Sequence, residues 1–313
     1  MILSLIDLNN PMLQQVAERC GEPVFAFQDV SQALHSEADI LITSGGQPLL
    51  DEERLSAMPS LKLILSVSAG VDKLPREALE RRGIIVCNAR GAHALSIAEY
   101  VLGAMLAFSY RIPQFVRNQE RRLWQHAYDA QPIEGKTLCV IGAGHIGSML
   151  GRKASALGMR VIGLKRRPEP IEGFQEVRPV SALHETLPEA DFAALVTPLT
   201  PETYHLMDEA AFARMKPSAV FINVSRGDTA DEEALIRALE NKQIVGAILD
   251  VFHTEPLPAD SPLWSMPNVL ISPHNGGFTQ DASDKTALMM VENIRRFREG
   301  RPLLNVVDLS RGY

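Results

Sequence analysis

The sequence predicts an α/β protein with two domains, each a parallel sheet that carries helices on both faces. Short apolar runs, which are typical of buried parallel strands, alternate with helical stretches along the chain. A glycine-rich turn joins the run 138–141 to an amphipathic stretch, and polar clusters directly follow several later runs. The 313 residues are enough for two domains with a core each.

The composition is that of an ordinary globular protein, with 46% hydrophobic and 22% charged residues. A net charge of -7 argues against a nucleic-acid partner, because phosphate backbones bind basic surfaces. No apolar run is long enough to cross a membrane, and the N-terminus lacks the basic stretch of a signal peptide. The cysteines are far apart, which predicts buried thiols at Cys87 and Cys139 and no zinc site. We therefore expect a cytoplasmic protein without a membrane, nucleic-acid or metal partner.

The N-terminal section alternates predicted strands with helical stretches. A helix is expected over residues 11–20, and strands over 2–6, 24–27, 40–43, 61–67 and 84–87. The third strand ends in a turn at Ser44-Gly45-Gly46, and the fourth ends in a glycine-containing loop from Ser68 to Asp72. Backbone N–H groups of that loop can hold a carboxylate, and a plain turn between strand and helix is an equal alternative.

A long helical stretch over residues 93–111 is apolar on more than one face. Such a helix is buried on more than one side, which points to a contact between domains or subunits. We place the crossing between the two domains at residues 91–93. A polar segment follows the helix and leads to the strand 138–141.

The glycine turn after that strand has the pattern of a dinucleotide-binding fingerprint. Gly142 permits the tight turn, Gly144 lets the backbone approach a pyrophosphate, and Gly147 lets the next helix pack on the strand. The helix then points its N–H groups and its positive dipole end at the phosphates. An ordinary turn is the alternative, but the strand before it and the amphipathic helix after it favour nucleotide binding. The predicted phosphate-binding residues are Gly142, Gly144, His145, Ile146 and Gly147.

The second strand of the nucleotide-binding unit, residues 160–164, ends in a cluster of cations. A site selective for NAD(H) needs Asp or Glu here to bind the ribose 2′-OH, whereas this chain has Lys165, Arg166 and Arg167. Three adjacent cations suit a 2′-phosphate, so the sequence predicts NADP(H) in preference to NAD(H). The alternative is a solvated basic turn, with Glu169 as a displaced ribose acid.

Polar clusters follow each of the later predicted strands, at 192–196, 220–224, 244–249 and 269–272, and a final helix is expected over 280–299. Ligands of open α/β sheets bind at the carboxyl ends of the strands, so these clusters are expected to meet at one edge. The further candidate cofactor ligands there are Thr197, Pro198, Thr203, Val224, Ser225, Asp250, His274 and Gly276.

Reduction of a ketone by a nicotinamide cofactor needs an acid, a cation for a substrate carboxylate, and a group that keeps the acid protonated. His274 is the predicted acid, because a Ser-Pro step aims it out of a strand end and glycines follow it. Glu255 is its predicted carboxylate partner. The planar guanidinium of Arg226 is predicted to bind the carboxylate and the carbonyl of the substrate. Among the other histidines, His253 and His126 are alternative acids, and the side chains of His35, His184 and His205 are expected in solvent.

Six motifs together resemble the D-isomer-specific 2-hydroxyacid dehydrogenase family. They occur in the order found in that family and cover nearly the whole chain. The motifs are SAGVD (68–72), VIGAGHIG (140–147), TPLTPET (197–203), INVSRG (222–227), ILDVFHTEPLP (248–258) and SPHNGG (272–277).

The resemblance implies a flavodoxin-like substrate-binding domain at 1–92 plus 281–313 and a Rossmann cofactor domain at 93–280. It implies a catalytic set of Arg226, Glu255 and His274, with Asp250 holding the nicotinamide carboxamide. It also implies a homodimer formed through the helical region 93–125. The substrate carboxylate is expected on Arg226 and on the backbone of Ala69, Gly70 and Val71.

The basic cluster is similar to that of NADPH-dependent glyoxylate and hydroxypyruvate reductases. The implied reaction is the reduction of a small 2-ketoacid to the D-2-hydroxyacid, with histidine as proton donor. Two alternatives stay open: a phosphoglycerate- or phosphite-type dehydrogenase of the same fold, and a non-enzymatic protein that senses NAD(P). The sequence leaves open the preferred side chain of the 2-ketoacid and the physiological direction.

Overall fold

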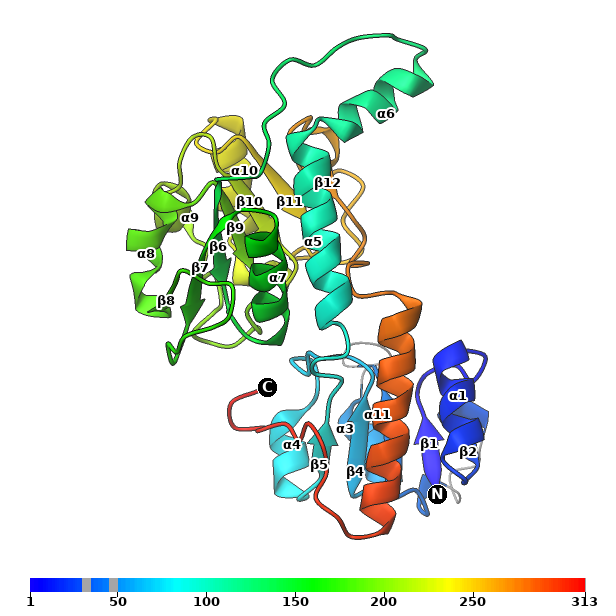
Figure 1. The fold of residues 1–313 in the computed structure, drawn as a ribbon. Coiled ribbons are helices and arrows are strands. Elements are labelled where there is room, and N and C mark those ends of the chain that lie inside the picture. The colour runs from blue at the N-terminus through cyan, green and yellow to red at the C-terminus, as the bar shows by residue number, and fades with distance from the viewer. Residues whose placement is uncertain (30–34, 45–49, 313) are drawn as a thin grey trace. The chain divides into compact units, whose positions relative to one another are not determined.

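The computed structural model describes residues 1–29, 35–44 and 50–312 and contains two compact units (Figure 1). One unit comprises Met1–His93 with Phe278–Tyr313, and the other Ala94–Gly277. The first unit is thus formed from both ends of the chain, and the second from its middle. The turn predicted at Gly45-Gly46 lies outside the described residues.

The first unit contains a five-stranded parallel sheet in the order β2-β1-β3-β4-β5. This order is the one found in flavodoxin-like folds, so the predicted fold of this unit is confirmed. The strands are β1 (Ile2–Ser4), β2 (Val24–Ala26), β3 (Ile40–Thr43), β4 (Leu63–Ser66) and β5 (Ile85–Cys87).

Helices cover both faces of this sheet, because alternate strand residues point to opposite sides. On one face, side chains such as Ile40 pack with α1 (Pro11–Arg19) and α11 (Gln280–Arg298). On the other, neighbours such as Leu41 pack with α3 (Glu52–Ala57) and α4 (Arg76–Arg81). The C-terminal helix α11 therefore completes a core that the N-terminal strands begin (Figure 1).

The second unit contains a seven-stranded parallel sheet in the order β12-β11-β10-β9-β6-β7-β8. Read from β8, the order is that of a Rossmann sheet, and the chain reverses direction across the sheet between β6 and β9. The strands are β6 (Thr137–Ile141), β7 (Arg160–Lys165), β8 (Glu176–Pro179), β9 (Phe192–Leu195), β10 (Val220–Asn223), β11 (Gly246–Leu249) and β12 (Val269–Ile271).

One face of the second sheet packs against α5 (Ala94–Ser109) and α7 (His145–Ala156). The other packs against α8 (Leu183–Thr186), α9 (Glu209–Phe212) and α10 (Glu232–Glu240). Short 3-10 helices occur at Phe27–Asp29, Val180–Ala182, Leu187–Glu189, Gly227–Thr229 and Pro262–Ser265.

Two elements of this unit were not predicted. Strand β8 lies at the sheet edge and is only partly buried, so it has no apolar run. Helix α6 (Ile112–Glu120) begins the segment that the sequence indicated only as polar. No single described helix has the length and apolar character of a membrane span; α5 and α6 pass that test only as a pair, with a bend of 67° between them.

Candidate active site

The glycine turn of the second unit has the geometry that the fingerprint predicts. Gly142 has a φ of +105°, and a Cβ there would lie 2.9 Å from the backbone nitrogen of Thr197. A Cβ on Gly147 would lie 2.4 Å from the carbonyl oxygen of Gly142. Both positions therefore require glycine, whereas Gly144 faces open space. No side chain caps the N-terminus of α7, so its backbone donors are left for a ligand.

A further polar group at this turn lacks a partner. The hydroxyl of Thr197 is buried and makes no hydrogen bond with any described residue. Its methyl group lies beside Gly142, so the hydroxyl belongs to the same strand-end edge. An orphaned buried hydroxyl beside an uncapped helix N-terminus fits the binding of a dinucleotide. The rest of this loop is closed on itself, since Thr203 Oγ1 donates to the Pro198 carbonyl over 2.6 Å.

A pocket of about 410 Å³ lies over the N-terminus of α7. Of the predicted cofactor ligands, Gly144, His145 and Lys165 line it, while Arg166 and Arg167 do not. The full lining is Ala143, Gly144, His145, Ser148, Met149, Arg152, Lys165, Ile171 and Glu172.

The cations at the end of β7 already interact with carboxylates of the chain. The ammonium of Lys165 forms an ion pair with Glu169, and this hydrogen bond lowers the pKa of Glu169. The hydroxyl of Thr200 and, more weakly, the charge of Arg166 lower the pKa of Glu202. A bound 2′-phosphate would therefore meet cations whose charge is partly neutralised.

His274 and Glu255 lie in direct contact at the ends of β12 and β11. The Nδ1 atom of His274 is 2.9 Å from one carboxylate oxygen of Glu255, and the other oxygen accepts the Phe252 N–H over 3.1 Å. Burial raises the pKa of Glu255, but these hydrogen bonds and the charges of His274 and Arg226 outweigh it and lower the pKa overall. The charge of Arg226 thus acts on the same carboxylate.

Arg226 is held by the loop that follows β10. Its carbonyl oxygen accepts hydrogen bonds from Thr229 Oγ1 over 2.6 Å and from Asn223 Nδ2 over 3.1 Å. Its own N–H donates to the hydroxyl of Ser225 over 2.6 Å. Ser225, a predicted cofactor ligand, therefore directs its buried side chain into the loop itself.

The structure distinguishes His274 from the alternative histidines by their partners. His253 pairs with Asp228 instead of Glu255, and this hydrogen bond raises the pKa of His253. His126 is exposed on the segment after α6. The expectation that His35 is solvated is wrong: its ring is buried, stacks on Phe27, and bonds the Phe27 carbonyl over 2.8 Å. His184 is exposed and His205 half-buried.

Asp250 closes the loop that carries His274. Its carboxylate is 3% exposed and accepts the N–H groups of Asn275 over 2.8 Å and Gly276 over 2.9 Å, together with the hydroxyl of Ser272. His274 has a φ of +52°, a left-handed conformation that costs a non-glycine residue about 1 kcal/mol. The hydrogen bonds to Asp250 offset that cost. Sequence reasoning missed Ser272 as a member of this site.

In the first unit, the loop after β4 presents three consecutive N–H groups. Among the described residues, no hydrogen bond uses the N–H of Ala69, Gly70 or Val71. The amide of Asn88 donates to the Ala69 carbonyl over 2.7 Å and holds the loop in shape. Three free donors in one loop suit a carboxylate, as the sequence predicts for this position.

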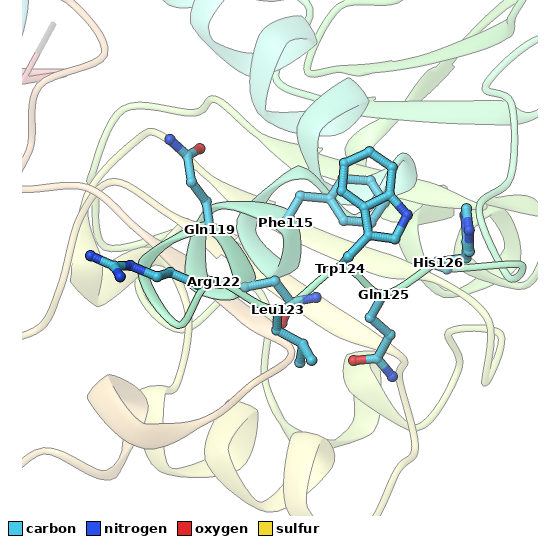
Figure 2. Close-up of a pocket in the computed structure, with 9 residues that line it drawn as sticks. Phe115, Gln119, Arg122, Leu123, Trp124, Gln125 and His126 are labelled. Atoms are coloured by element: carbon cyan, nitrogen blue, oxygen red, sulfur yellow. The ribbon is translucent and has the colours of Figure 1, made fainter.

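A second pocket, of about 570 Å³, lies on α6 and the segment after it, and the sequence did not predict it (Figure 2). Phe115, Leu123 and Trp124 contribute large apolar side chains to its lining, and Trp124 is 92% exposed. The lining residues are Phe115, Asn118, Gln119, Arg122, Leu123, Trp124, Gln125, His126 and Ala127.

The fold and the strand-end site define a dinucleotide-binding α/β protein, and comparison with known proteins gives its family. Residues 102–276 match the family model described as D-isomer specific 2-hydroxyacid dehydrogenase, NAD binding domain. The chain belongs to this family.

Two groups of relatives occur at similar identity. The glyoxylate reductase of Korarchaeum cryptofilum is 32% identical over 87% of this chain and 83% of its own length. The D-3-phosphoglycerate dehydrogenase of Methanocaldococcus jannaschii is 36% identical over 87% of this chain, which spans only 52% of that protein. The chain thus covers about half the length of the phosphoglycerate dehydrogenases that it matches.

Solved structures agree over almost the whole chain. A family member from Aeromonas salmonicida has a TM-score of 0.87 and 34% identity, with 98% of this chain and 99% of that chain covered. A D-isomer specific 2-hydroxyacid dehydrogenase from Xanthobacter autotrophicus Py2, in complex with NADPH and MES, has a TM-score of 0.84 and 30% identity, covering 100% and 99%.

Proposed function

We propose that the protein uses NADPH to reduce a small 2-ketoacid, of the glyoxylate or hydroxypyruvate kind, to the D-2-hydroxyacid. The observation that carries this proposal is the contact of His274 with Glu255. The charge of Arg226 also lowers the pKa of the Glu255 carboxylate. An imidazole oriented by a carboxylate, with a guanidinium nearby, is suited to protonate a carbonyl beside a carboxylate.

The reduced nicotinamide, when bound, supplies hydride to the keto carbon. The protein must then place a proton on the carbonyl oxygen. Because Nδ1 of His274 faces Glu255, its Nε2–H is the group that donates this proton. Arg226 binds the substrate carboxylate and carbonyl. Asp250 holds the His274 loop and would hold the nicotinamide carboxamide when the cofactor is bound.

The preference for NADPH rests on Lys165, which lines the pocket over α7. The solved relative from Xanthobacter autotrophicus contains NADPH, and a second one, from Sinorhizobium meliloti, is described as an NADPH-dependent glyoxylate/hydroxypyruvate reductase. The pairing of Lys165 with Glu169 favours a modest preference, since Glu169 competes with a 2′-phosphate for the ammonium. With NADH bound, Glu169 can instead accept the ribose 2′-OH.

A phosphoglycerate dehydrogenase is the second candidate, because relatives of that name match at similar identity. A phosphorylated substrate needs extra cations near Ser68 to Asp72, and Lys73 and Arg76 are the nearest in sequence. The guanidinium of Arg76 packs against Gly312, where an added Cβ would lie 2.3 Å from Nη1. This contact directs Arg76 to the C-terminal tail and disfavours it as a phosphate ligand. Turnover of a ketoacid separates a non-enzymatic NAD(P) sensor from the proposal, and reduction of NAD(P)+ by phosphite would identify a phosphite-type dehydrogenase.

We further propose a homodimer formed through the helical region 93–125 and a cytoplasmic location. Helix α6 and the segment after it expose Phe115, Val116, Leu123 and Trp124, and three of these line the pocket of Figure 2. The side-chain nitrogen of Asn118, also at this pocket, is buried without a partner among the described residues. A second copy would cover the exposed apolar side chains. Sedimentation equilibrium of the wild type and of Leu123→Asp tests the homodimer, and a monomeric wild type would refute the homodimer.

The deciding experiment measures initial rates of NADPH and NADH oxidation with glyoxylate, hydroxypyruvate, pyruvate, phenylpyruvate and 3-phosphohydroxypyruvate. Turnover of the unphosphorylated acids with a higher kcat/KM for NADPH is expected. A preference for 3-phosphohydroxypyruvate would move the assignment to the phosphoglycerate class. Absence of turnover in protein that binds the cofactor would favour the sensor.

A further inference from the structure

We propose that Tyr100 is a positioning residue that sets the loop 272–277, and with it the acid His274, through Ser272 and Asp250. The role in turnover rests on the proposed function, whereas the role in holding the loop does not. Tyr100 lies in α5, and the hydroxyl of its side chain is 2.5 Å from Ser272 Oγ.

The direction of the hydrogen bonds follows from the number of protons. The hydroxyl of Ser272 donates its one hydrogen to the carboxylate of Asp250. The bond between Tyr100 and Ser272 must therefore be donated by the tyrosine. Burial raises the pKa of Tyr100, and the charge of Asp250 adds to this effect against the opposing bond to Ser272, so the hydroxyl stays a donor. The result is a chain from tyrosine to serine to carboxylate, in which each bond polarises the next.

Asp250 depends on these donors because of its burial. Among the described residues, it forms no ion pair with a cation. The hydroxyl of Ser272 and the N–H groups of Asn275 and Gly276 are its hydrogen-bond donors. A buried carboxylate without a cation is stable only when such donors are well aligned. The same carboxylate oxygens define the backbone on the C-terminal side of His274.

The ring of Tyr100 also touches this loop. A Cβ added to Gly276 would lie 3.0 Å from Tyr100 Cδ1 and 3.0 Å from the second carboxylate oxygen of Asp250. Gly276 is therefore packed between the tyrosine ring and the carboxylate. His274, two residues earlier, has the left-handed φ of +52°. This strained residue lies between Ser272, which bonds Tyr100, and Gly276, which packs between Tyr100 and Asp250.

Helix α5 provides a rigid base for this contact. Its residues Ala98, Val101 and Leu102 are buried in one core with Leu150 and Ala154 of α7. Helix α7, whose N-terminus would receive the cofactor phosphates, thus packs against α5. The loop that carries the acid is also bonded to α5, through Tyr100. The hydroxyl of Tyr100 is the polar link between that helix and the loop.

The test is Tyr100→Phe, which removes the hydroxyl and keeps the ring. Tyr204→Phe, at a tyrosine that is 54% exposed, is the matched control. Amide hydrogen exchange at Asn275 and Gly276 should become faster in Tyr100→Phe, with no change at the amides of β11. The kcat should fall by about 5- to 20-fold, with the ketoacid KM and the NADPH Kd near wild type, because a displaced acid affects the chemical step.

Ser272→Ala gives a second, independent measurement. If the two hydroxyls act in one chain, Tyr100→Phe adds no further loss of kcat in the Ser272→Ala background. Unchanged exchange at Asn275 and Gly276 would overturn the proposal, and so would additive losses or an effect confined to KM. If the wild type turns over no ketoacid, the proposed function fails, and the exchange measurement still decides the role of Tyr100.

Discussion

The two parts of the strand-end edge in the second unit differ in how their polar groups are held. After β10, β11 and β12, side chains bond to one another and to the loops: Glu255 to His274 and Phe252, and Asp250 to three donors. After β7, the cations lie at the surface, and Glu169, the partner of Lys165, is 65% exposed. Geometry is therefore strongly determined at the first place and weakly at the second.

This difference separates the reaction from the choice of cofactor. The buried carboxylate of Asp250 keeps the loop of the proton donor in one position, which a chemical step requires. An exposed ion pair contributes about 0–1 kcal/mol and is screened by salt. We therefore expect large effects from changes at His274 and Glu255 and modest ones at Lys165.

The largest effect is expected for His274→Ala. Loss of a general acid should lower kcat by about 10²- to 10⁴-fold, while the Kd for NADPH stays near the wild-type value. The matched control is His253→Ala, because His253 has a carboxylate partner of its own in Asp228. Steady-state kinetics and fluorescence titration of NADPH measure the two quantities. Near-normal kcat in His274→Ala, or a comparable loss in His253→Ala, would remove His274 from its assigned role.

Sheet topology explains how the sequence could suggest Glu255 as the partner of His274, with which it is in contact in the structure. Parallel strands end at one edge, and the order of motifs places Glu255 and His274 after the adjacent strands β11 and β12. Local pattern and sheet topology placed the two residues at one edge but left His253 and His126 open as alternative acids. The catalytic set as a whole came from the resemblance to the family.

Tyr100 shows where that reasoning ends. It lies 172 residues before Ser272, in a helix whose sequence indicates only an apolar, buried element. The same limit applies to β8, whose charged residues show no strand periodicity, and to His35, whose burial depends on stacking against Phe27. In each case a tertiary contact decides the outcome, and the local sequence carries no trace of it.

The second prediction concerns Glu255→Gln, which keeps the shape of the side chain and removes its charge. The kcat should fall by about 10- to 100-fold, because the amide no longer stabilises a protonated imidazole. Glu255 acts on the reaction through its hydrogen bond to His274, and the acid itself stays in place in Glu255→Gln. The loss of kcat should therefore be smaller than in His274→Ala. A kcat equal to that of the wild type would show that the carboxylate only packs against the ring.

The same substitution has a defined effect on stability as a function of pH. The pKa of Glu255 is lowered in the folded state from its ordinary value of 4.5. Its contribution is therefore fully present above that value and is lost as the pH falls through the lowered, folded-state pKa. The difference in Tm between wild type and Glu255→Gln should be constant above pH 4.5 and should shrink below it. A difference that grows on acidification would contradict the shift.

The smallest effect is expected at the basic cluster, where Lys165→Ala should lower kcat/KM for NADPH by about tenfold and that for NADH by less. Lys153→Ala is the matched control, because Lys153 forms an ion pair with Glu99 and does not line the pocket over α7. Glu169→Gln should act in the opposite direction, since it frees the ammonium of Lys165 for a 2′-phosphate and leaves only a neutral, weaker acceptor for the ribose hydroxyl. The preference for NADPH over NADH, in the wild type and in Glu169→Gln, should weaken as the salt concentration is raised, because the charges are exposed.

Equal losses of kcat/KM with the two cofactors in Lys165→Ala would mean that Lys165 contacts a part common to NADPH and NADH. The exposed cluster would then have no part in cofactor choice, and the contrast between the two ends of the edge would be one of position alone.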